Sequence, residues 1–192
     1  MFVPRLASSV SDVEALKREA GIAACDFIRS GMKLGLGTGS TVKYTVIEIG
    51  RRITEEGLEV VGVPTSEATR ILANQVGIPL VSLAETGGLD LVIDGADEFD
   101  GNFALIKGGG GALTREKIVA QTSNGMVVVA DDRKKVSTLG ALFFLIEILP
   151  FELSRSTHQL VEICTCLLIS SDADEHTTLL SLAALMIVDR PT

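Results

Sequence analysis

The sequence has 192 residues, 46% of them hydrophobic, with a formal net charge of -8 and a pI near 4.8. A chain of this size and composition can bury a sizeable core as one domain, or as one domain with an appendage. The acidic balance disfavours a surface built to bind nucleic acid.

Membrane and disulfide-rich classes are disfavoured as well. Segment 1–9 lacks the apolar stretch of a signal peptide, and the longest apolar runs fall short of the ~20 residues of a membrane helix. Cys25, Cys164 and Cys166 give neither an even disulfide framework nor a zinc-ligand pattern. We therefore expect a cytoplasmic protein with reduced thiols and no membrane partner.

The first predicted element is an amphipathic helix that starts at a capping box, Ser11–Glu14, and ends at Gly31. Its apolar residues at helical spacing are Val13, Leu16, Ala20, Ala24 and Phe27. Lys17 lies off this stripe, which favours a solvated surface lysine.

A strand, a glycine-rich turn and a helix follow, over Lys33–Leu36, Gly37–Thr41 and Val42–Glu56. This order is typical of a phosphate cradle, because glycines allow close backbone approach and a helix N-terminus offers N–H groups. The turn matches neither the Walker A pattern nor the dinucleotide fingerprint. The next strand, Leu58–Val63, ends without an acid to hold a ribose hydroxyl, so we expect no nucleotide cofactor.

Helical and strand patterns continue to alternate up to the middle of the chain. We predict a helix over Ser66–Val76, a short strand over Leu80–Leu83 and a buried strand over Leu89–Ile93. The alternation predicts an α/β fold, a Rossmann-like, mostly parallel sheet with helices on both faces.

The segment Asp94–Glu116 concentrates the candidate chemistry. Asp94 and Asp97 follow the buried strand, at the edge where open α/β sheets bind ligands. A second apolar run, Phe103–Ile106, ends in Lys107 and four glycines that can turn N–H groups toward an anion. A helix over Ala112–Thr122 then carries Glu116 in its first turns. Its predicted core residues are Leu113, Ile118 and Val119.

Carboxylates beside a lysine suit proton transfer on a small oxygenated substrate, since a carboxylate can act as base and a lysine can stabilise an oxyanion. Two other interpretations remain open. The aspartates can be turn formers or helix caps, or they can be ligands of a magnesium ion.

The last core strand is predicted over Met126–Ala130, and the charge run that follows it offers Lys134 as a second phosphate contact. We place a domain boundary here, with a catalytic domain over 1–136. Residues 137–192 form a C-terminal segment that we interpret as an incomplete small α/β appendage, a lid or an oligomerisation region. Its apolar runs, 160–169 and 179–188, require a covering surface.

Four motifs together resemble the A-type ribose-5-phosphate isomerase family. They are Gly37–Thr41, Asp94–Asp97, Lys107–Gly110 and Leu113–Lys117. The resemblance runs from about Val13 to about Phe151, and the segment from Cys164 onward does not show it. It implies interconversion of ribose 5-phosphate and ribulose 5-phosphate through a cis-enediolate, in the non-oxidative pentose phosphate pathway, without metal or cofactor. It also implies a homodimer or higher homo-oligomer.

The resemblance also implies roles for individual residues. Glu116 is the base that moves a proton between C2 and C1, Asp94 assists ring opening, and Lys107 holds the enediolate oxygens. Lys17 is a peripheral phosphate contact. The implied substrate-binding residues are Thr38, Gly39, Ser40, Thr41, Asp94, Gly95, Ala96, Asp97, Lys107, Gly108, Gly109, Gly110 and Lys134.

Three alternatives to this function remain. One is a sugar-phosphate sensor domain of the same superfold that binds without catalysis, although only one helix precedes the glycine turn. Another is an isomerase that its altered C-terminus has disabled. The third is an amino-sugar phosphate deaminase, which the distance of His158 and His176 from the motifs disfavours.

Overall fold

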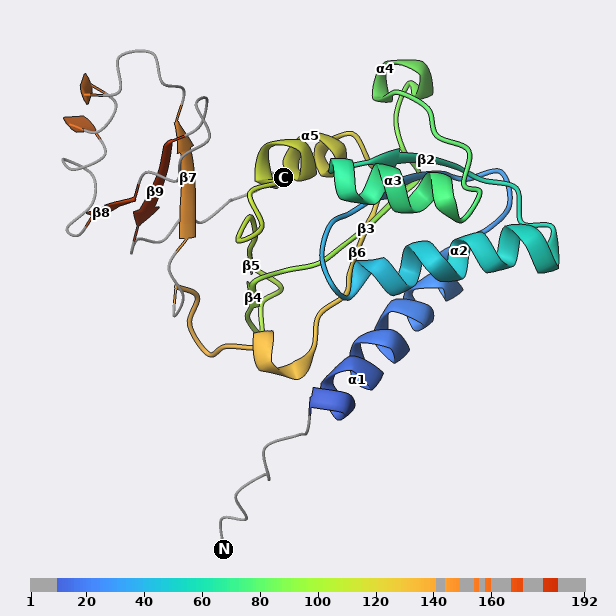
Figure 1. Ribbon diagram of the computed structural model, residues 1–192, viewed down its shortest axis with the longest axis horizontal. Helices are drawn as coiled ribbons and strands as arrows, with labels where there is room; N and C mark the ends of the chain where they lie inside the picture. Colours follow the sequence, from blue (N-terminus) through green and yellow to red (C-terminus); the bar gives the residue numbers. More distant parts are fainter. Residues whose placement is uncertain are drawn as a thin grey trace, which may run out of the picture. The chain divides into compact units, whose positions relative to one another are not determined.

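The computed structural model describes residues 10–140, 144–148, 154–155, 158–159, 167–170 and 178–182. The chain divides into two compact units. Unit 1 comprises the residues up to Gly95 together with Thr114–Asp132, and unit 2 comprises Ala96–Leu113 together with the residues from Arg133 onward. Figure 1 labels their helices and strands.

Unit 1 is built on a parallel sheet of four strands in the order β2-β1-β3-β6. The strands are β1 (Lys33–Leu36), β2 (Val61–Pro64), β3 (Leu91–Asp94) and β6 (Met126–Val128). In the register, Leu36 lies between Pro64 and Ile93. Since all pairs are parallel, the carboxyl ends of the strands meet at one edge of the sheet.

Helices cover both faces of this sheet. The helices of unit 1 are α1 (Val10–Ala23), α2 (Val42–Glu56), α3 (Glu67–Gln75), α4 (Leu83–Thr86) and α5 (Leu113–Gln121), with the 3-10 turn η1 (Ala24–Phe27). A second 3-10 turn, η2 (Asp132–Lys134), spans the boundary between the units in the sequence. On one face Ile93 packs in a cluster with Val46 and Ile49 of α2. On the other, its neighbour Val92 packs with Val119 of α5. The predicted α/β fold with a parallel sheet is confirmed.

Unit 2 contains short antiparallel strands. One pair is β4 (Glu98–Phe99) with β5 (Leu105–Ile106), and a sheet in the order β7-β9-β8 is formed by β7 (Phe144–Ile148), β8 (Leu167–Ser170) and β9 (Thr178–Leu182). Thus two strands lie within or beside the apolar runs of the C-terminal segment. The rest of those runs, and Cys164, Cys166 and His176, lie outside the described residues.

The predicted strand Leu80–Leu83 is wrong, and the apolar run Phe103–Ile106 forms only a short strand. Leu80 makes only an isolated parallel bridge to Gly62, and a capping box of Ser82 and Glu85 starts α4 instead. The run predicted from Phe103 contains only the two-residue β5. Phe103 has a φ of 63° and is 89% exposed, in a turn where Asp100 Oδ1 accepts two backbone N–H bonds. In both places local side-chain to backbone bonds override the apolar pattern.

Four apolar side chains predicted to face the core are partly exposed instead, namely Leu16, Phe27, Leu113 and Ile118. The reason at Phe27 is that α1 ends at Ala23 and tightens into a 3-10 turn, so the 3.6-residue period is lost. In α5 the buried residues are Glu116 and Val119.

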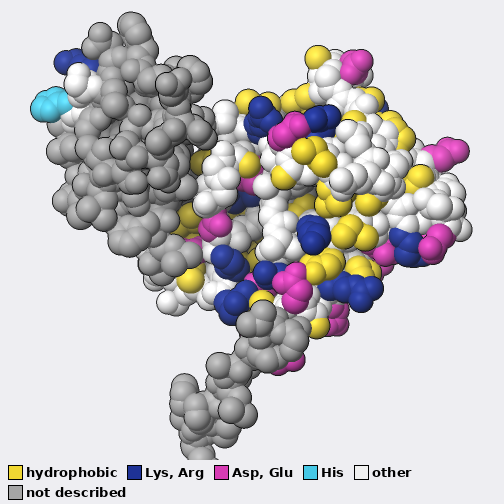
Figure 2. Space-filling model, viewed as in Figure 1, with side chains coloured by type: hydrophobic (Ala, Val, Ile, Leu, Met, Phe, Trp, Pro, Cys, Tyr) yellow, Lys and Arg dark blue, Asp and Glu magenta, His cyan; other side chains and the backbone are white. Residues whose placement is uncertain are grey.

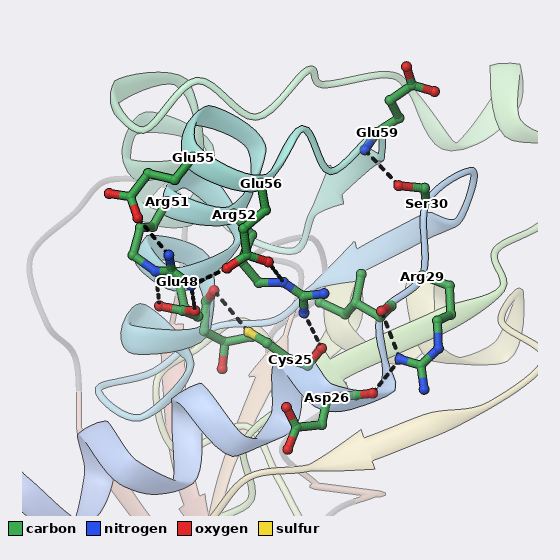
Figure 3. Close-up of polar contacts among 12 residues, drawn as sticks. Cys25, Asp26, Arg29, Ser30, Glu48, Arg51, Arg52, Glu55, Glu56 and Glu59 are labelled. Atoms are coloured by element: carbon green, nitrogen blue, oxygen red, sulfur yellow. Dashed lines mark hydrogen bonds and ion pairs between the residues drawn. The ribbon is translucent and has the colours of Figure 1, made fainter.

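The outer surface of α2 carries an arginine-glutamate cluster, drawn in Figure 3. Arg51 bridges Glu48, Glu55 and Glu56 at 2.6 to 2.7 Å. Such exposed pairs add little stability individually. On the face shown in Figure 2, basic and acidic side chains are interspersed in the same way. Among the described residues, none of the helices combines the length and apolar character needed to cross a membrane.

Cys25 is a free, buried thiol, in agreement with the expected reduced state. Burial, with a smaller contribution from Glu48, raises the pKa of Cys25 to about 12. At pH 8 the thiolate fraction is then about 10⁻⁴, and the thiolate is the nucleophile. We expect iodoacetamide at pH 8 to label Cys25 at least about 100-fold more slowly in the folded protein than in urea, as measured by peptide mass spectrometry. Equal labelling rates would contradict the buried position.

Candidate active site

The glycine-rich turn predicted as a phosphate cradle connects β1 to α2. Gly39 has a φ of 128°, which glycine adopts readily. Thr38 is half-buried, Ser40 is exposed and Thr41 is buried at the N-cap of α2. Within the described residues, no side-chain hydrogen bond caps the first turn of α2. The N–H groups of Lys43 and Tyr44 already donate to the carbonyls of Gly39 and Thr41, at 3.0 and 3.1 Å. An external anion at this end of the helix would therefore be bound by the other N–H groups and the hydroxyls of the turn.

Asp94 holds this turn in place. It ends β3 and is completely buried. Its Oδ1 accepts the N–H of Thr38 at 3.0 Å and the N–H of Gly95 at 2.7 Å. Gly37 makes the approach feasible, because a Cβ on Gly37 would lie 2.2 Å from the same Oδ1. Two motifs 56 residues apart in the sequence are thus in direct contact.

Glu116 lies at the same edge of the sheet. It is only 5% exposed, in the first turn of α5. One turn later, Val119 packs over Gly35 and Val92 on the central strands. Because α5 leads back to the start of β6, which is parallel to β3, its first turn lies at the carboxyl ends of the strands. Unit 1 therefore places Glu116, Asp94 and the glycine turn at one edge.

In unit 2, Asp97 orders the second glycine turn. Its Oδ2 accepts the N–H of Gly109 at 2.7 Å, and its own N–H donates to Ile106 at 2.7 Å. The turn uses a positive φ at Gly108 and Gly111, of 100° and 74°. Among the substrate-binding residues predicted beside it, Lys107 and Gly108 are half-buried, whereas Gly109 and Gly110 are exposed. Asp97, predicted as a substrate contact, also has this structural function.

Lys134 is half-buried and lies in the 3-10 turn η2, whose other two residues are exposed. The chain after it is bound to β4, because Phe99 and Lys135 form a parallel bridge and Val136 N–H donates to the Phe99 carbonyl at 2.9 Å. Glu98, 1% exposed, accepts the N–H of Gly140 at 2.7 Å. The segment carrying Lys134 is thereby tied to the strand that follows Asp97, within unit 2.

The predicted solvated character of Lys17 is wrong. Its side chain is 17% exposed, and its Nζ lies 3.6 Å from Glu14. Glu14 also accepts a hydrogen bond from Tyr44 of α2, and this bond lowers the pKa of Glu14. The helix α1 passes close to the glycine turn here, since a Cβ on Gly21 would lie 2.7 Å from the Thr41 carbonyl oxygen.

Comparison with known proteins agrees with this geometry. The family model described as Ribose 5-phosphate isomerase A (phosphoriboisomerase A) matches residues 61–189. Ribose-5-phosphate isomerase A of Nitrobacter hamburgensis is 52% identical over 153 residues, covering 80% of this chain and 66% of the relative. That of Cereibacter sphaeroides is 53% identical over 152 residues, covering 79% of this chain and 60% of the relative.

This chain belongs to the ribose 5-phosphate isomerase A family.

Solved structures of the family support the same assignment. Ribose 5-phosphate isomerase A from Methanocaldococcus jannaschii is 37% identical with a TM-score of 0.82, covering 92% of this chain and 82% of that one. A D-ribose-5-phosphate isomerase in complex with phospho-erythronic acid is 31% identical with a TM-score of 0.82, covering 92% and 81%.

The family model extends to residue 189, whereas the two curated relatives match only 153 and 152 of the 192 residues of this chain, so the expected departure of the segment from Cys164 onward stays a prediction. The chain nevertheless spans only about 60 to 66% of the length of the curated relatives reported above.

Proposed function

We propose that this chain interconverts D-ribose 5-phosphate and D-ribulose 5-phosphate by proton transfer. The observation that carries the proposal is the joint position of Glu116, Asp94 and the Gly37–Thr41 turn at one sheet edge, in a member of this family. A base, a structured loop and an anion cradle are what an aldose-ketose isomerase of a sugar phosphate needs.

In the proposed mechanism, Glu116 removes the C2 proton of the open-chain aldose. The electron pair moves toward the aldehyde and leaves an enediolate with negative charge on oxygen. The hydroxyl proton of C2 passes from O2 to O1, and Glu116 returns its proton to C1 as the C2 carbonyl forms. The product is the ketose, and no atoms are gained or lost. Lys107 stabilises the oxygen charge that exists chiefly along the reaction path.

The substrate phosphate is assigned to Thr38, Gly39, Ser40 and Thr41, with Lys134 and Lys17 as further contacts. Asp94 has two functions in this proposal: it fixes the Thr38 amide, as its hydrogen bond indicates, and it assists ring opening. Binding of a sugar phosphate is consistent with the phospho-erythronic acid complex of the related isomerase. We also propose that the active form is a homo-oligomer.

The direct test is to add ribose 5-phosphate to the purified chain and assay for ketose, before and after exhaustive dialysis against EDTA. We expect turnover in both samples. Binding without turnover would overturn the isomerase and favour a sensor domain or a disabled enzyme. If dialysis abolished the activity and magnesium restored it, the aspartates would be identified as metal ligands.

Kinetics should separate Lys107 from the glycine turn. We expect Lys107→Ala to lower kcat by about 10² and to change KM much less, since its target charge develops in the transition state. Ser40→Ala should instead raise KM and the inhibition constant of inorganic phosphate, by roughly 3- to 10-fold. Lys117→Ala, at an exposed position on α5, is the control for lost charge. Equal changes in kcat and KM for both variants would refute this division of roles.

A further inference from the structure

Two pairs of hydroxyl groups lie against the Gly37–Thr41 turn. Of their four residues only Thr38 belongs to a sequence motif. In one pair, Thr38 Oγ1 lies 2.7 Å from Thr65 Oγ1. In the other, Ser66 Oγ lies 3.0 Å from Thr69 Oγ1, which in turn bonds the Gly37 carbonyl at 2.8 Å. Thr65 is 0% exposed and Thr69 is 7% exposed.

In the second pair, the donor and the acceptor of each hydrogen bond are defined. The Thr69 N–H donates to Ser66 Oγ at 3.2 Å, which is an ordinary N-cap of α3. Ser66 donates its hydroxyl proton to Thr69 Oγ1, and Thr69 donates its own to Gly37, 32 residues away. Each hydroxyl carries a single proton, so the one on Thr69 is committed to the Gly37 carbonyl. This last bond goes beyond what a helix cap requires.

The first pair controls the hydroxyl of Thr38. Thr65 continues the sheet pairing, because its N–H donates to the Leu36 carbonyl at 2.9 Å. The hydroxyl contact permits either oxygen to donate. If Thr65 donates, the proton of Thr38 is directed away from the pair and is available to an anion in the turn.

The turn is thus held from both neighbouring strands. From the β3 side, the Ile93 carbonyl accepts the Gly37 N–H at 2.9 Å and Asp94 accepts the Thr38 N–H. From the β2 side, Thr65 and Thr69 bond the Thr38 hydroxyl and the Gly37 carbonyl. This matches the sheet order β2-β1-β3, in which β1 lies between the other two.

We propose that Thr65 and Thr69 are positioning residues for the anionic ligand of the turn, with Thr65 donating to Thr38 so that Thr38 donates to the anion. The proposal rests on the proposed function through the assignment of this turn to phosphate. Both residues act through the turn and neither is assigned a contact with substrate.

The test compares Thr65→Val, Thr69→Val and the conservative Thr65→Ser with a matched control, Thr45→Val. Thr45 is also buried, at 1% exposure, and its hydroxyl donates to the Gly21 carbonyl at 2.8 Å, between α1 and α2. The probes are inorganic phosphate, titrated by calorimetry, and ribose 5-phosphate kinetics. Amide hydrogen exchange of residues 37–41 without ligand reports the order of the turn directly.

We expect Thr65→Val and Thr69→Val to raise the Kd for phosphate and the KM by about tenfold, with kcat within about twofold of wild type. Thr69→Val should also lose exchange protection in the turn, and Thr65→Ser should bind as wild type. Thr45→Val should lower Tm without changing phosphate affinity.

Wild-type affinity in both valine variants, or an equal loss in Thr45→Val, would overturn the positioning role. If a valine variant does not fold, Thr65→Ser and Thr69→Ser are compared with wild type. Both serine variants keep the hydroxyl. Wild-type phosphate affinity and exchange protection in both then support the role, and a loss of either quantity in either variant refutes the claim that the hydroxyl alone is required. A wild-type chain that binds phosphate without turnover would overturn the isomerase, while the phosphate titrations still decide the positioning role.

Discussion

Glu116→Gln is expected to lower kcat by about 10² to 10⁴, the usual contribution of a general base. The substitution keeps the size of the side chain and removes its ability to take a proton from carbon. Glu116 is 5% exposed in the first turn of α5, so we expect glutamine to occupy the same position. Because the base acts on the reacting carbon and not on the phosphate, KM for ribose 5-phosphate should change much less than kcat.

Steady-state kinetics with purified variants provides the measurement. Glu67→Gln is a matched control, since Glu67 is also a first-turn glutamate, on α3, but is exposed and paired with Arg70. It should retain wild-type kcat. If Glu116→Gln retains kcat as well, Glu116 is a helix residue without a catalytic function, and the base must be sought at Asp94 or Asp97.

The sheet of unit 1 could be predicted well because each of its signals is local. Buried parallel strands give short apolar runs, and glycine or proline punctuates them. Leu34, Leu36 and Ile93, all in predicted strands, are indeed at most 1% exposed. The order of the four motifs also indicates the family without any tertiary contact. The edge position of Asp94 and of the glycine turn follows from strand direction alone.

The contacts that organise the site could not be predicted in the same way, because they join distant parts of the chain. No local pattern indicates that Thr69 donates to the Gly37 carbonyl, or that Asp97 accepts the Gly109 N–H. The run Pro64–Ser66 follows the predicted strand Leu58–Val63 and contains no ribose-binding acid, and its hydroxyls carry no distinguishing signal in the sequence. A hydroxyl after a strand is usually a turn or cap residue, and Ser66 does cap α3.

The glycines of the turn differ from these hydroxyl residues. They are conspicuous in the sequence, but the sequence does not indicate which structural function each glycine has. A glycine in a turn can supply a positive φ, or it can supply space for a neighbour. Gly39 does the first, with a φ of 128°. Gly37 does the second, because its missing Cβ leaves room for the Asp94 carboxylate. Only the structure distinguishes these two uses.

The second prediction with a large expected effect follows from that space. In Gly37→Ala the new Cβ would lie 2.2 Å from Asp94 Oδ1, 2.4 Å from its Cγ and 2.6 Å from its Cα. The last of these atoms belongs to the backbone of β3, so a side-chain rotation cannot relieve the overlap. Either the turn or the end of β3 must shift, which separates the Thr38 N–H from the carboxylate that holds it.

We expect Gly37→Ala to reduce the free energy of unfolding by about 1–3 kcal/mol, as overpacking does, and to reduce kcat/KM by about 10² or more. Urea denaturation and the ribose 5-phosphate assay measure the two quantities. Gly101→Ala is the control, since a Cβ there meets no atom within 4 Å and its φ lies outside the left-handed range, and it should change neither quantity. If Gly37→Ala were as stable and active as Gly101→Ala, the close contact between the turn and Asp94 would have no functional role. The Gly37–Thr41 turn would then bind its anion without support from the Asp94 carboxylate.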